Sequence, residues 1–270
     1  MRYYHRIMSR PGRLWFPICA LSVLAGAGIL RLSEPAALAR PIAAPAQDAA
    51  QQVPAVQTPD QPTGPQARGT RSELKLDNVR DGALYVPPGY KSGVEMPLVV
   101  WLHGAGGSGN VSNNLALLAD EFGFIVLAPD SREWTWGSIL GRWEGDLTFL
   151  QRAMQLTTAR YSIDRQRIWL GGFSDGASFS LSLGISYGNV FKRIYAGSPG
   201  VMLPIEANGK PPIFISHGTS DQTMPIDVTS RKFVPRLKTL GYDVTYREYE
   251  GRHQLPPEIL REAITWMTQK

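Results

Sequence analysis

Residues 167–176 read RIWLGGFSDG, an apolar segment followed directly by the pattern Gly-x-Ser-x-Gly around Ser174. Residues 167–170 predict a buried β-strand, and residues 175 to about 187 predict a helix. Glycines two positions before and two positions after a serine are typical of a strained strand-to-helix turn that exposes the serine hydroxyl. The alternative is a helix whose first turn Ser174 merely caps. The strands around this turn and the residues downstream of it decide between the two interpretations.

Strands and helices alternate on both sides of this turn, within residues 70–270. The expected strands are residues 73–76, 84–86, 97–102, 124–127, 167–170, 193–196, 212–216 and 243–249. The expected helices are residues 113–121, 146–160, 175–187, 228–240 and 257–268. This alternation predicts an α/β domain with a doubly wound, mostly parallel sheet, helices on both faces and two short antiparallel strands at the start. Only about fifteen residues separate strand 193–196 from Pro212, which leaves room for little or no cap domain.

A serine hydroxyl is a poor nucleophile at neutral pH and needs a base, usually histidine, to take its proton. The chain has four histidines, of which His5 lies near the N-terminus and His103 and His217 each precede a glycine at a strand end. His253 follows the last expected strand and precedes the last helix. In a sheet of this type the base comes last in chain order. We therefore expect His253 to be the general base for Ser174.

A carboxylate should follow the penultimate strand, where it can hold the imidazole in the correct tautomer. Residues 217–221, HGTSD, follow strand 212–216 and supply Asp221. Asp227 is the rival, but it is better explained as an acidic residue in the first turn of the next helix. We therefore expect Asp221 to orient His253.

The negative oxygen of an acyl-transfer transition state needs two backbone N–H donors. One is expected from Asp175, which follows the nucleophile, and the other from the loop after an early strand. That loop is HGAGG at residues 103–107, and Ala105 is the candidate donor. We expect His103 to order the loop and not to act as an acid or base.

The same loop supports a competing interpretation. Residues 104–109, GAGGSG, match the dinucleotide-binding pattern G-x-G-x-x-G, and Asp130 lies 21 residues beyond Gly109. The pattern does not lie on the first strand, however, and the hydrolase arrangement uses the loop for another purpose. A dinucleotide-dependent oxidoreductase is therefore kept only as a minor alternative.

Three tryptophans lie in the loop after strand 124–127, on the side where ligands of such sheets bind: Trp134, Trp136 and Trp143. They either line an aromatic wall for an acyl, aryl or sugar group or simply pack a long loop. The residue pattern alone favours neither reading.

Composition separates the N-terminus from the rest of the chain. Residues 1–40 hold six Arg and one acid, whereas the whole chain of 270 residues has 28 Lys and Arg against 23 Asp and Glu, so residues 41–270 are neutral overall. An apolar run at residues 14–30 follows the first four arginines and precedes small-residue sites, which predicts a signal peptide or an N-terminal anchor in residues 1–40. Residues 41–69 are rich in Pro, Ala and Gln and predict a disordered linker. Cys19 is the only cysteine, which excludes a disulfide framework and a cysteine-based metal cluster.

Residues 80–268 resemble a serine esterase of the α/β-hydrolase superfamily. The resemblance is to the phospholipase/carboxylesterase branch, with secreted polyhydroxyalkanoate-depolymerase-like and feruloyl esterases as neighbours. It rests on the motifs YVPPGY, PLVVWLHGAGGSG, GFIVLAPD, GGFSDGAS, ISHGTSDQTMPI and GRHQLPPEI. The resemblance implies the α/β-hydrolase fold, a triad of Ser174, Asp221 and His253, and oxyanion donors at Ala105 and Asp175. Ala177 departs from relatives that often carry a second glycine after the turn.

Together these features predict an exported, cofactor-free and metal-free hydrolase that cleaves carboxylic esters through an acyl-enzyme. Its partner would be a small-molecule or polymeric ester and not a nucleic acid, because no basic face is visible in the neutral body. Its place would be periplasmic or secreted, or anchored by residues 14–30 with the catalytic domain outside the cytoplasm. The alternatives are a thioesterase or peptidase with the same triad, the oxidoreductase above, or a non-catalytic binding module.

Overall fold

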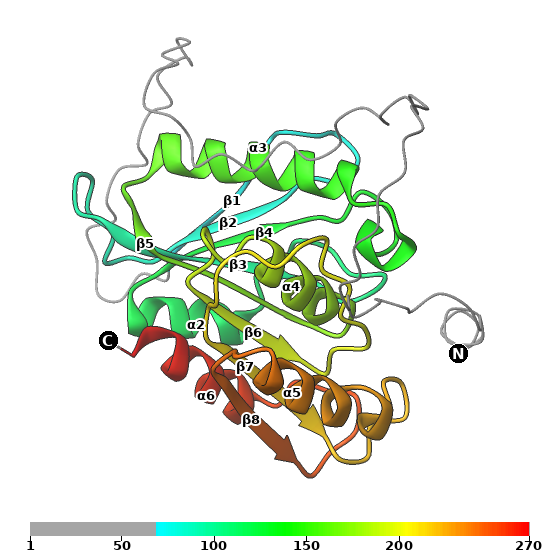
Figure 1. Cartoon of the computed structure of the whole chain (residues 1–270). Helices are drawn as coiled ribbons and strands as arrows, with labels where there is room; N and C mark the ends of the chain where they lie inside the picture. Colours follow the sequence, from blue (N-terminus) through cyan, green and yellow to red (C-terminus); the bar gives the residue numbers. More distant parts are fainter. Residues whose placement is uncertain (1–68, 270) are drawn as a thin grey trace, which may run out of the picture. The chain divides into compact units, whose positions relative to one another are not determined.

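An eight-stranded mixed sheet forms the centre of the computed structural model, which describes residues 69–269 (Figure 1). The strands lie in the order β1-β2-β4-β3-β5-β6-β7-β8. Their bounds are β1 Thr70–Glu73, β2 Gly82–Val86, β3 Met96–Leu102, β4 Ile125–Pro129, β5 Ile163–Phe173, β6 Arg193–Gly197, β7 Ile213–Gly218 and β8 Val244–Tyr249. The pairs from β4 to β8 are parallel, and only β1–β2 and β2–β4 are antiparallel. This is the predicted doubly wound sheet, with an antiparallel start.

Helices cover both faces of the sheet, as the alternating pattern predicts. Their bounds are α2 Asn113–Phe122, α3 Glu144–Arg160, α4 Asp175–Ser186, α5 Ser230–Thr239 and α6 Pro257–Thr268, with short 3-10 turns η1 Gly137–Leu140 and η2 Ile226–Val228. Helices α2 and α6 share one buried cluster with side chains from β3, β4 and β7. Helices α4 and α5 share a second cluster with side chains from β6, β7 and β8. The two clusters pack against opposite faces of the sheet. This packing keeps the carboxyl ends of the parallel strands in place.

The first strand differs from its prediction. Residues 73–76 were expected to be extended, but β1 covers Thr70–Glu73, with Thr70 opposite Val86 in β2. The chain turns away from the sheet immediately afterwards, because the Asp81 carboxylate accepts hydrogen bonds from the backbone N–H groups of Lys75 and Leu76. A side chain that binds local backbone N–H groups competes with strand pairing and ends the strand early.

The segment between β6 and β7 is short and lies along helix α4, so the domain has no cap inserted there. Three serines spaced four residues apart on α4 hold this segment by its backbone. The Ser178 hydroxyl accepts from the N–H of Gly200, that of Ser182 from Leu203, and that of Ser186 from Ile205, at 2.8–3.0 Å. Each hydroxyl also donates to the carbonyl four residues earlier. This row of serines, Ser178, Ser182 and Ser186, is called the serine stripe. It provides hydrogen-bond acceptors on a fully buried helix for the backbone N–H groups of the adjacent segment.

The predicted signal or anchor at residues 1–40 and nearly all of the predicted linker at residues 41–69 lie outside the described residues. Gly69 is the exception, and its N–H donates to the Tyr85 hydroxyl at 2.8 Å. Within residues 69–269, no helix combines the length and the apolar character that crossing a lipid bilayer requires.

Candidate active site

Ser174 lies at the turn between β5 and α4 with φ 60° and ψ −122°, a conformation that costs energy for any residue with a Cβ. Its N–H donates to the Gly197 carbonyl at 2.8 Å, which ties the turn to β6. The two flanking glycines are required by close backbone approach. A Cβ on Gly172 would lie 2.6 Å from the Gly176 carbonyl, and one on Gly176 would lie 2.1 Å from the Leu102 carbonyl oxygen. The glycine spacing in the sequence therefore corresponds to a real steric need.

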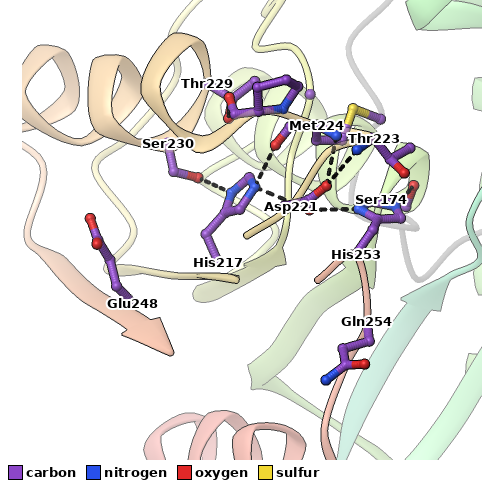
Figure 2. Close-up of polar contacts among 12 residues, drawn as sticks. Ser174, His217, Asp221, Thr223, Met224, Thr229, Ser230, Glu248, His253 and Gln254 are labelled. Atoms are coloured by element: carbon purple, nitrogen blue, oxygen red, sulfur yellow. Dashed lines mark hydrogen bonds and ion pairs between the residues drawn. The ribbon is translucent and has the colours of Figure 1, made fainter. Parts of the chain in front are cut away.

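His253 and Asp221 meet at this turn from two different loops (Figure 2). The Ser174 Oγ lies 2.8 Å from His253 Nε2, and His253 Nδ1 lies 2.7 Å from Asp221 Oδ2. A carboxylate only accepts, so Nδ1 carries the imidazole proton and Nε2 is left to accept from the serine hydroxyl. Phe173 packs against the imidazole with ring centroids 4.8 Å apart. The three side chains thus form one continuous hydrogen-bonded chain.

The Asp221 carboxylate is buried and surrounded by donors. Its Oδ1 accepts from the backbone N–H groups of Thr223 and Met224 at 2.9 and 2.8 Å, and its Oδ2 faces His253 and His217. Burial raises the pKa of Asp221, but the hydrogen bonds from His217, His253 and Met224 outweigh it and hold the pKa well below its ordinary value. Asp221 is therefore ionised at neutral pH despite its burial.

Asp227, the rival carboxylate, is not part of this group. Its side chain is 77% exposed and forms an ion pair with Arg231 at 2.7 Å. It lies in the 3-10 turn η2, outside the first turn of α5, which begins at Ser230 and holds no acidic residue there, so the predicted place in the first turn of that helix is wrong.

The loop after β3 lies beside the nucleophile. A Cβ on Gly104 would be 3.3 Å from the Ser174 Cβ, so the backbone around Gly104 and Ala105 borders the hydroxyl. The other expected donor, the N–H of Asp175, belongs to the first turn of α4, where N–H groups have no acceptor within the helix. The structure thus brings both backbone segments next to Ser174.

His103 is one of the residues that order this loop. Its Nε2 accepts from the N–H of Ser131 at 3.0 Å, so Nδ1 carries the proton and donates to the Gly104 carbonyl at 2.7 Å. Burial lowers the pKa of His103, which favours this neutral form. Trp136 adds a bond from its indole N–H to the His103 carbonyl at 2.8 Å.

The glycine pattern at residues 104–109 serves the fold of this loop. The Asp130 carboxylate accepts a hydrogen bond from the N–H of Gly109 and is nearly buried. A Cβ on Gly109 would lie 2.1 Å from the Ala128 carbonyl oxygen. Asp130 is therefore occupied in closing the loop onto β4, which argues against its use as the ribose-binding residue of a dinucleotide site.

Asp175 has a side chain whose environment the sequence does not reveal. The carboxyl group is 1% exposed, its Oδ2 accepts from the Thr135 hydroxyl, and its Oδ1 has no hydrogen-bond partner. Burial raises the pKa of Asp175 to about 6, against a smaller opposing effect of His253. A buried acid therefore adjoins the nucleophile and ties the turn to the loop after β4.

The three tryptophans occupy different environments. Trp136 is 1% exposed and stacks on Phe179 of α4 at 4.9 Å, and Trp143 packs on the same ring at 5.5 Å. Trp134 is 59% exposed, and its indole lies close to Gly106, where a Cβ would meet it at 2.9 Å. Trp134 is therefore the one of the three with a largely exposed ring, whereas Trp136 is buried against Phe179.

His217 is the residue that the sequence interpretation passed over. Its place before a glycine at a strand end indicates no role, yet its side chain contacts Asp221 four residues later. The spacing of His217 and Asp221 was visible in the sequence, but only the fold of the intervening turn decides whether the two side chains meet. No cluster of three or more His, Cys, Asp or Glu side chains able to hold a metal ion occurs among residues 69–269.

Comparisons with known proteins agree with this architecture. Residues 147–269 match the phospholipase/carboxylesterase family. Acyl-protein thioesterase 1 of Gibberella zeae is 31% identical over 115 residues, which are 39% of this chain and 48% of that protein. A probable feruloyl esterase C of Aspergillus terreus is 29% identical over 160 residues, 56% of this chain and 58% of that protein. The chain thus spans about half the length of these curated relatives.

Among solved structures, the crystal structure of esterase PE8 is similar with a TM-score of 0.54 and 25% identity, over 69% of this chain and 96% of that one. The family match covers the turn at Ser174 and the loops of Asp221 and His253, and it leaves out the loop after β3. The strand order, the helices on both faces and these matches together show the α/β-hydrolase fold. Over residues 147–269, the chain is therefore similar to the phospholipase/carboxylesterase family, on a fold of the α/β-hydrolase type.

Proposed function

We propose that the protein is a serine hydrolase that cleaves carboxylic esters through an acyl-enzyme. The observation that carries this proposal is the unbroken chain from Ser174 Oγ to His253 Nε2, and from His253 Nδ1 to Asp221 Oδ2, at distances of 2.8 and 2.7 Å. A histidine within hydrogen-bonding distance of a serine, itself oriented by a carboxylate, is the arrangement that activates a serine hydroxyl.

In the proposed reaction, Ser174 Oγ attacks the ester carbonyl carbon while its proton passes to His253 Nε2. The carbonyl oxygen becomes an oxyanion that accepts from the N–H groups of Ala105 and Asp175. The imidazolium, stabilised by ionised Asp221, then gives the same proton to the departing alkoxide, which leaves the acyl group on Ser174. Water deprotonated by His253 attacks this acyl group, and the acid is released as the proton returns to Ser174.

The environment of Asp221 supports the role of the carboxylate. Its lowered pKa keeps it charged when His253 takes the proton, so the transient imidazolium always faces a negative partner. Its Oδ1 is held by two backbone N–H groups, which leaves Oδ2 directed at His253. The carboxylate therefore requires no reorganisation at the moment of proton transfer.

A thioester is the second candidate substrate, favoured by the similarity to an acyl-protein thioesterase at 31% identity. The same triad would serve, with a thiolate as leaving group. The two functions are separated by kcat/KM for a matched pair of substrates that carry the same acyl chain on oxygen and on sulfur. A ratio that favours the oxygen ester, after correction for the uncatalysed rates of the two substrates, supports the esterase; the reverse ratio supports the thioesterase.

The acyl or aryl group of the substrate is proposed to contact Trp134. Its exposed ring beside the loop after β3 offers apolar area to a bulky acyl or aryl group, and a relative named as a probable feruloyl esterase supports an aromatic acyl group. Polymeric esters remain within the proposed substrate class, since the segment between β6 and β7 leaves the site without an inserted cap.

Export is proposed from the N-terminal sequence alone. Four arginines precede the apolar residues 14–30, and small-x-small sites at residues 25–27 and 37–39 fit cleavage by a signal peptidase. The catalytic domain would then act in the periplasm or outside the cell, either free or held by an uncleaved anchor.

A further inference from the structure

We propose that His217 is a positioning residue that fixes the carboxylate of Asp221 for its work on His253. This inference rests on the proposed function and assigns a role to a second histidine of the site. His217 lies at the end of β7, is fully buried, and its side chain points into the turn that carries Asp221 (Figure 2).

The contacts of His217 define its tautomer. Its Nε2 lies 2.8 Å from the Met224 carbonyl oxygen, which only accepts, so Nε2 carries the proton. Its Nδ1 lies 2.7 Å from the Ser230 hydroxyl and accepts from it. The hydroxyl of α5 thereby holds the imidazole in the form whose N–H faces the turn at residues 221–224.

The same Nε2 lies 3.3 Å from Asp221 Oδ2, the oxygen that receives the proton of His253 Nδ1 at 2.7 Å. Asp221 Oδ2 is therefore flanked by two imidazole N–H groups, and Oδ1 by two backbone N–H groups. With both oxygens restrained, the carboxylate has no easy rotation that would turn Oδ2 away from His253.

Met224 closes the arrangement through its backbone. Its N–H donates to Asp221 Oδ1 at 2.8 Å, while its carbonyl accepts from His217 at 2.8 Å. His217 thus binds both the carboxylate and the backbone that holds the carboxylate. A buried histidine with only a packing role could satisfy both ring nitrogens through Ser230 and Met224. The additional contact to Asp221 Oδ2, the oxygen that binds His253, is what indicates a positioning role.

The test exploits the two ring positions of histidine. The amide nitrogen of Gln reaches about as far as Nε2 and can donate to Met224 and Asp221, whereas the amide of Asn reaches only about as far as Nδ1. The expected result for His217→Asn is a fall in kcat on the order of tenfold or more for a short-chain aryl ester, with KM within twofold of the wild type. His217→Gln should recover most of that loss, although both variants lose a similar amount of thermal stability.

A spectroscopic readout makes the test independent of turnover. The proton shared by His253 Nδ1 and Asp221 should give a far-downfield proton resonance in the wild type, identified by its loss in His253→Ala. We expect this resonance to move upfield or broaden in His217→Asn and to return in His217→Gln. Glu248→Gln is the control for a charge change near the site, because Glu248 pairs with His217 across β7 and β8 while its carboxylate binds Arg231; it should leave kcat unchanged.

The proposal is overturned if His217→Asn keeps more than half of the wild-type kcat, or if Asn and Gln lose equal activity while the downfield resonance stays in place. A wild-type protein that turns over no ester but shows the resonance and its loss in His217→Asn would retain the positioning role and remove the proposed ester substrate. The two failures are therefore distinguishable.

Discussion

Ser174 is held at φ 60° by a turn that closes only because Gly172 and Gly176 lack side chains. Its hydroxyl is presented to His253 at 2.8 Å, and the strain of its backbone is balanced by the N–H bond to Gly197 and by packing on both sides. The conformation of this turn therefore depends on the absence of one carbon atom at each glycine, because a methyl group there would collide with backbone atoms.

Asp175 makes stability depend on pH in a direction that can be worked out. Its folded-state pKa is raised from an ordinary value of 3.8 to about 6, so the folded protein binds the proton more tightly than the unfolded chain. Its contribution to stability is greatest below pH 4 and declines as pH rises through 6. Asp175→Asn removes this dependence, so the variant should gain up to about 3 kcal/mol relative to wild type between pH 4 and pH 8. Urea unfolding of both proteins at several pH values measures the difference.

Thr135→Val is the companion variant, because it removes the hydroxyl that donates to Asp175 and leaves the carboxyl in place. Its pH dependence should be at least as steep as that of the wild type. A stability difference between wild type and Asp175→Asn that stays constant from pH 4 to pH 8 would contradict the buried-acid account.

The sequence predicts the location of individual residues where that location follows from the order of the strands along the chain. Ser174, Asp221 and His253 follow the ends of β5, β7 and β8, and a parallel sheet brings such ends to one edge. His217 and the bond between Thr135 and Asp175 could not be predicted, because each depends on how a loop folds against a distant element. Burial of the Asp175 carboxyl is likewise a property of packing and not of the motif.

Helix α4 shows how one element serves both the site and its surroundings. All twelve of its residues are buried, and its N-terminus carries the turn of Ser174. Ser178, Ser182 and Ser186 repeat every four residues and therefore share one face, which holds the segment between β6 and β7. Burying polar groups on a central helix is tolerated here because each of these hydroxyls both donates and accepts.

Ser182→Ala should destabilise the domain by about 1–3 kcal/mol, because it leaves the N–H of Leu203 without its acceptor in a partly buried site. Ser180→Ala is the matched control. Ser180 lies on the same helix and is equally buried, but its hydroxyl has no hydrogen-bond partner. That variant should be neutral or slightly stabilising in chemical denaturation. Equal losses in the two variants would show that the serine stripe does not hold the segment.

Two tryptophans of the loop after β4 should have different roles, one in substrate binding and one in packing. Trp134→Ala removes exposed ring area beside the loop after β3, so kcat/KM for a feruloyl or longer acyl ester should fall roughly ten- to a hundredfold relative to acetate. Trp136→Ala removes a buried ring that stacks on Phe179, so it should lower the melting temperature and affect all esters alike. The measurement is the ratio of kcat/KM for the bulky ester to that for acetate. A ratio unchanged in Trp134→Ala would leave that ring without a substrate role.

The predicted elements agree best with the structure where the pattern is long and apolar. Residues 257–268 form α6 with the predicted bounds, since an amphipathic run after a proline defines both ends. The strand expected at residues 167–170 extends over Ile163–Phe173, because pairing with β3 continues beyond the apolar core of the segment. The strand expected at residues 73–76 was misplaced, since the Asp81 side chain captures the backbone there and local apolar content does not report such a contact.

The sheet brings together site residues that lie far apart in the sequence. The ends of β3, β5, β7 and β8 supply the loop of Ala105, the turn of Ser174, and the loops of Asp221 and His253. Two core clusters on opposite faces keep these strand ends in register. The arrangement of strands could be predicted because alternating strands and helices allow few topologies, and right-handed crossovers reduce them further.

The proposed export predicts a defined N-terminus for the mature protein. Mass spectrometry of protein recovered from outside the cytoplasm should give a chain that begins after Ala27 or Ala39, the two small-x-small sites. Replacing Ala25 and Ala27 by bulky residues is the control, and it should abolish the first start while leaving the second. An intact chain from Met1 in the membrane fraction would instead support an anchor through residues 14–30.

Covalent labelling of the nucleophile tests the central claim most directly. The full chain is treated with a fluorophosphonate, which forms a stable adduct with an activated serine, and the modified peptide is identified by mass spectrometry. We predict a single adduct on Ser174, none in Ser174→Ala, and labelling slowed by several orders of magnitude in His253→Ala, because the hydroxyl then has no base at 2.8 Å. Labelling at another residue, or equal labelling of wild type and His253→Ala, would contradict the account.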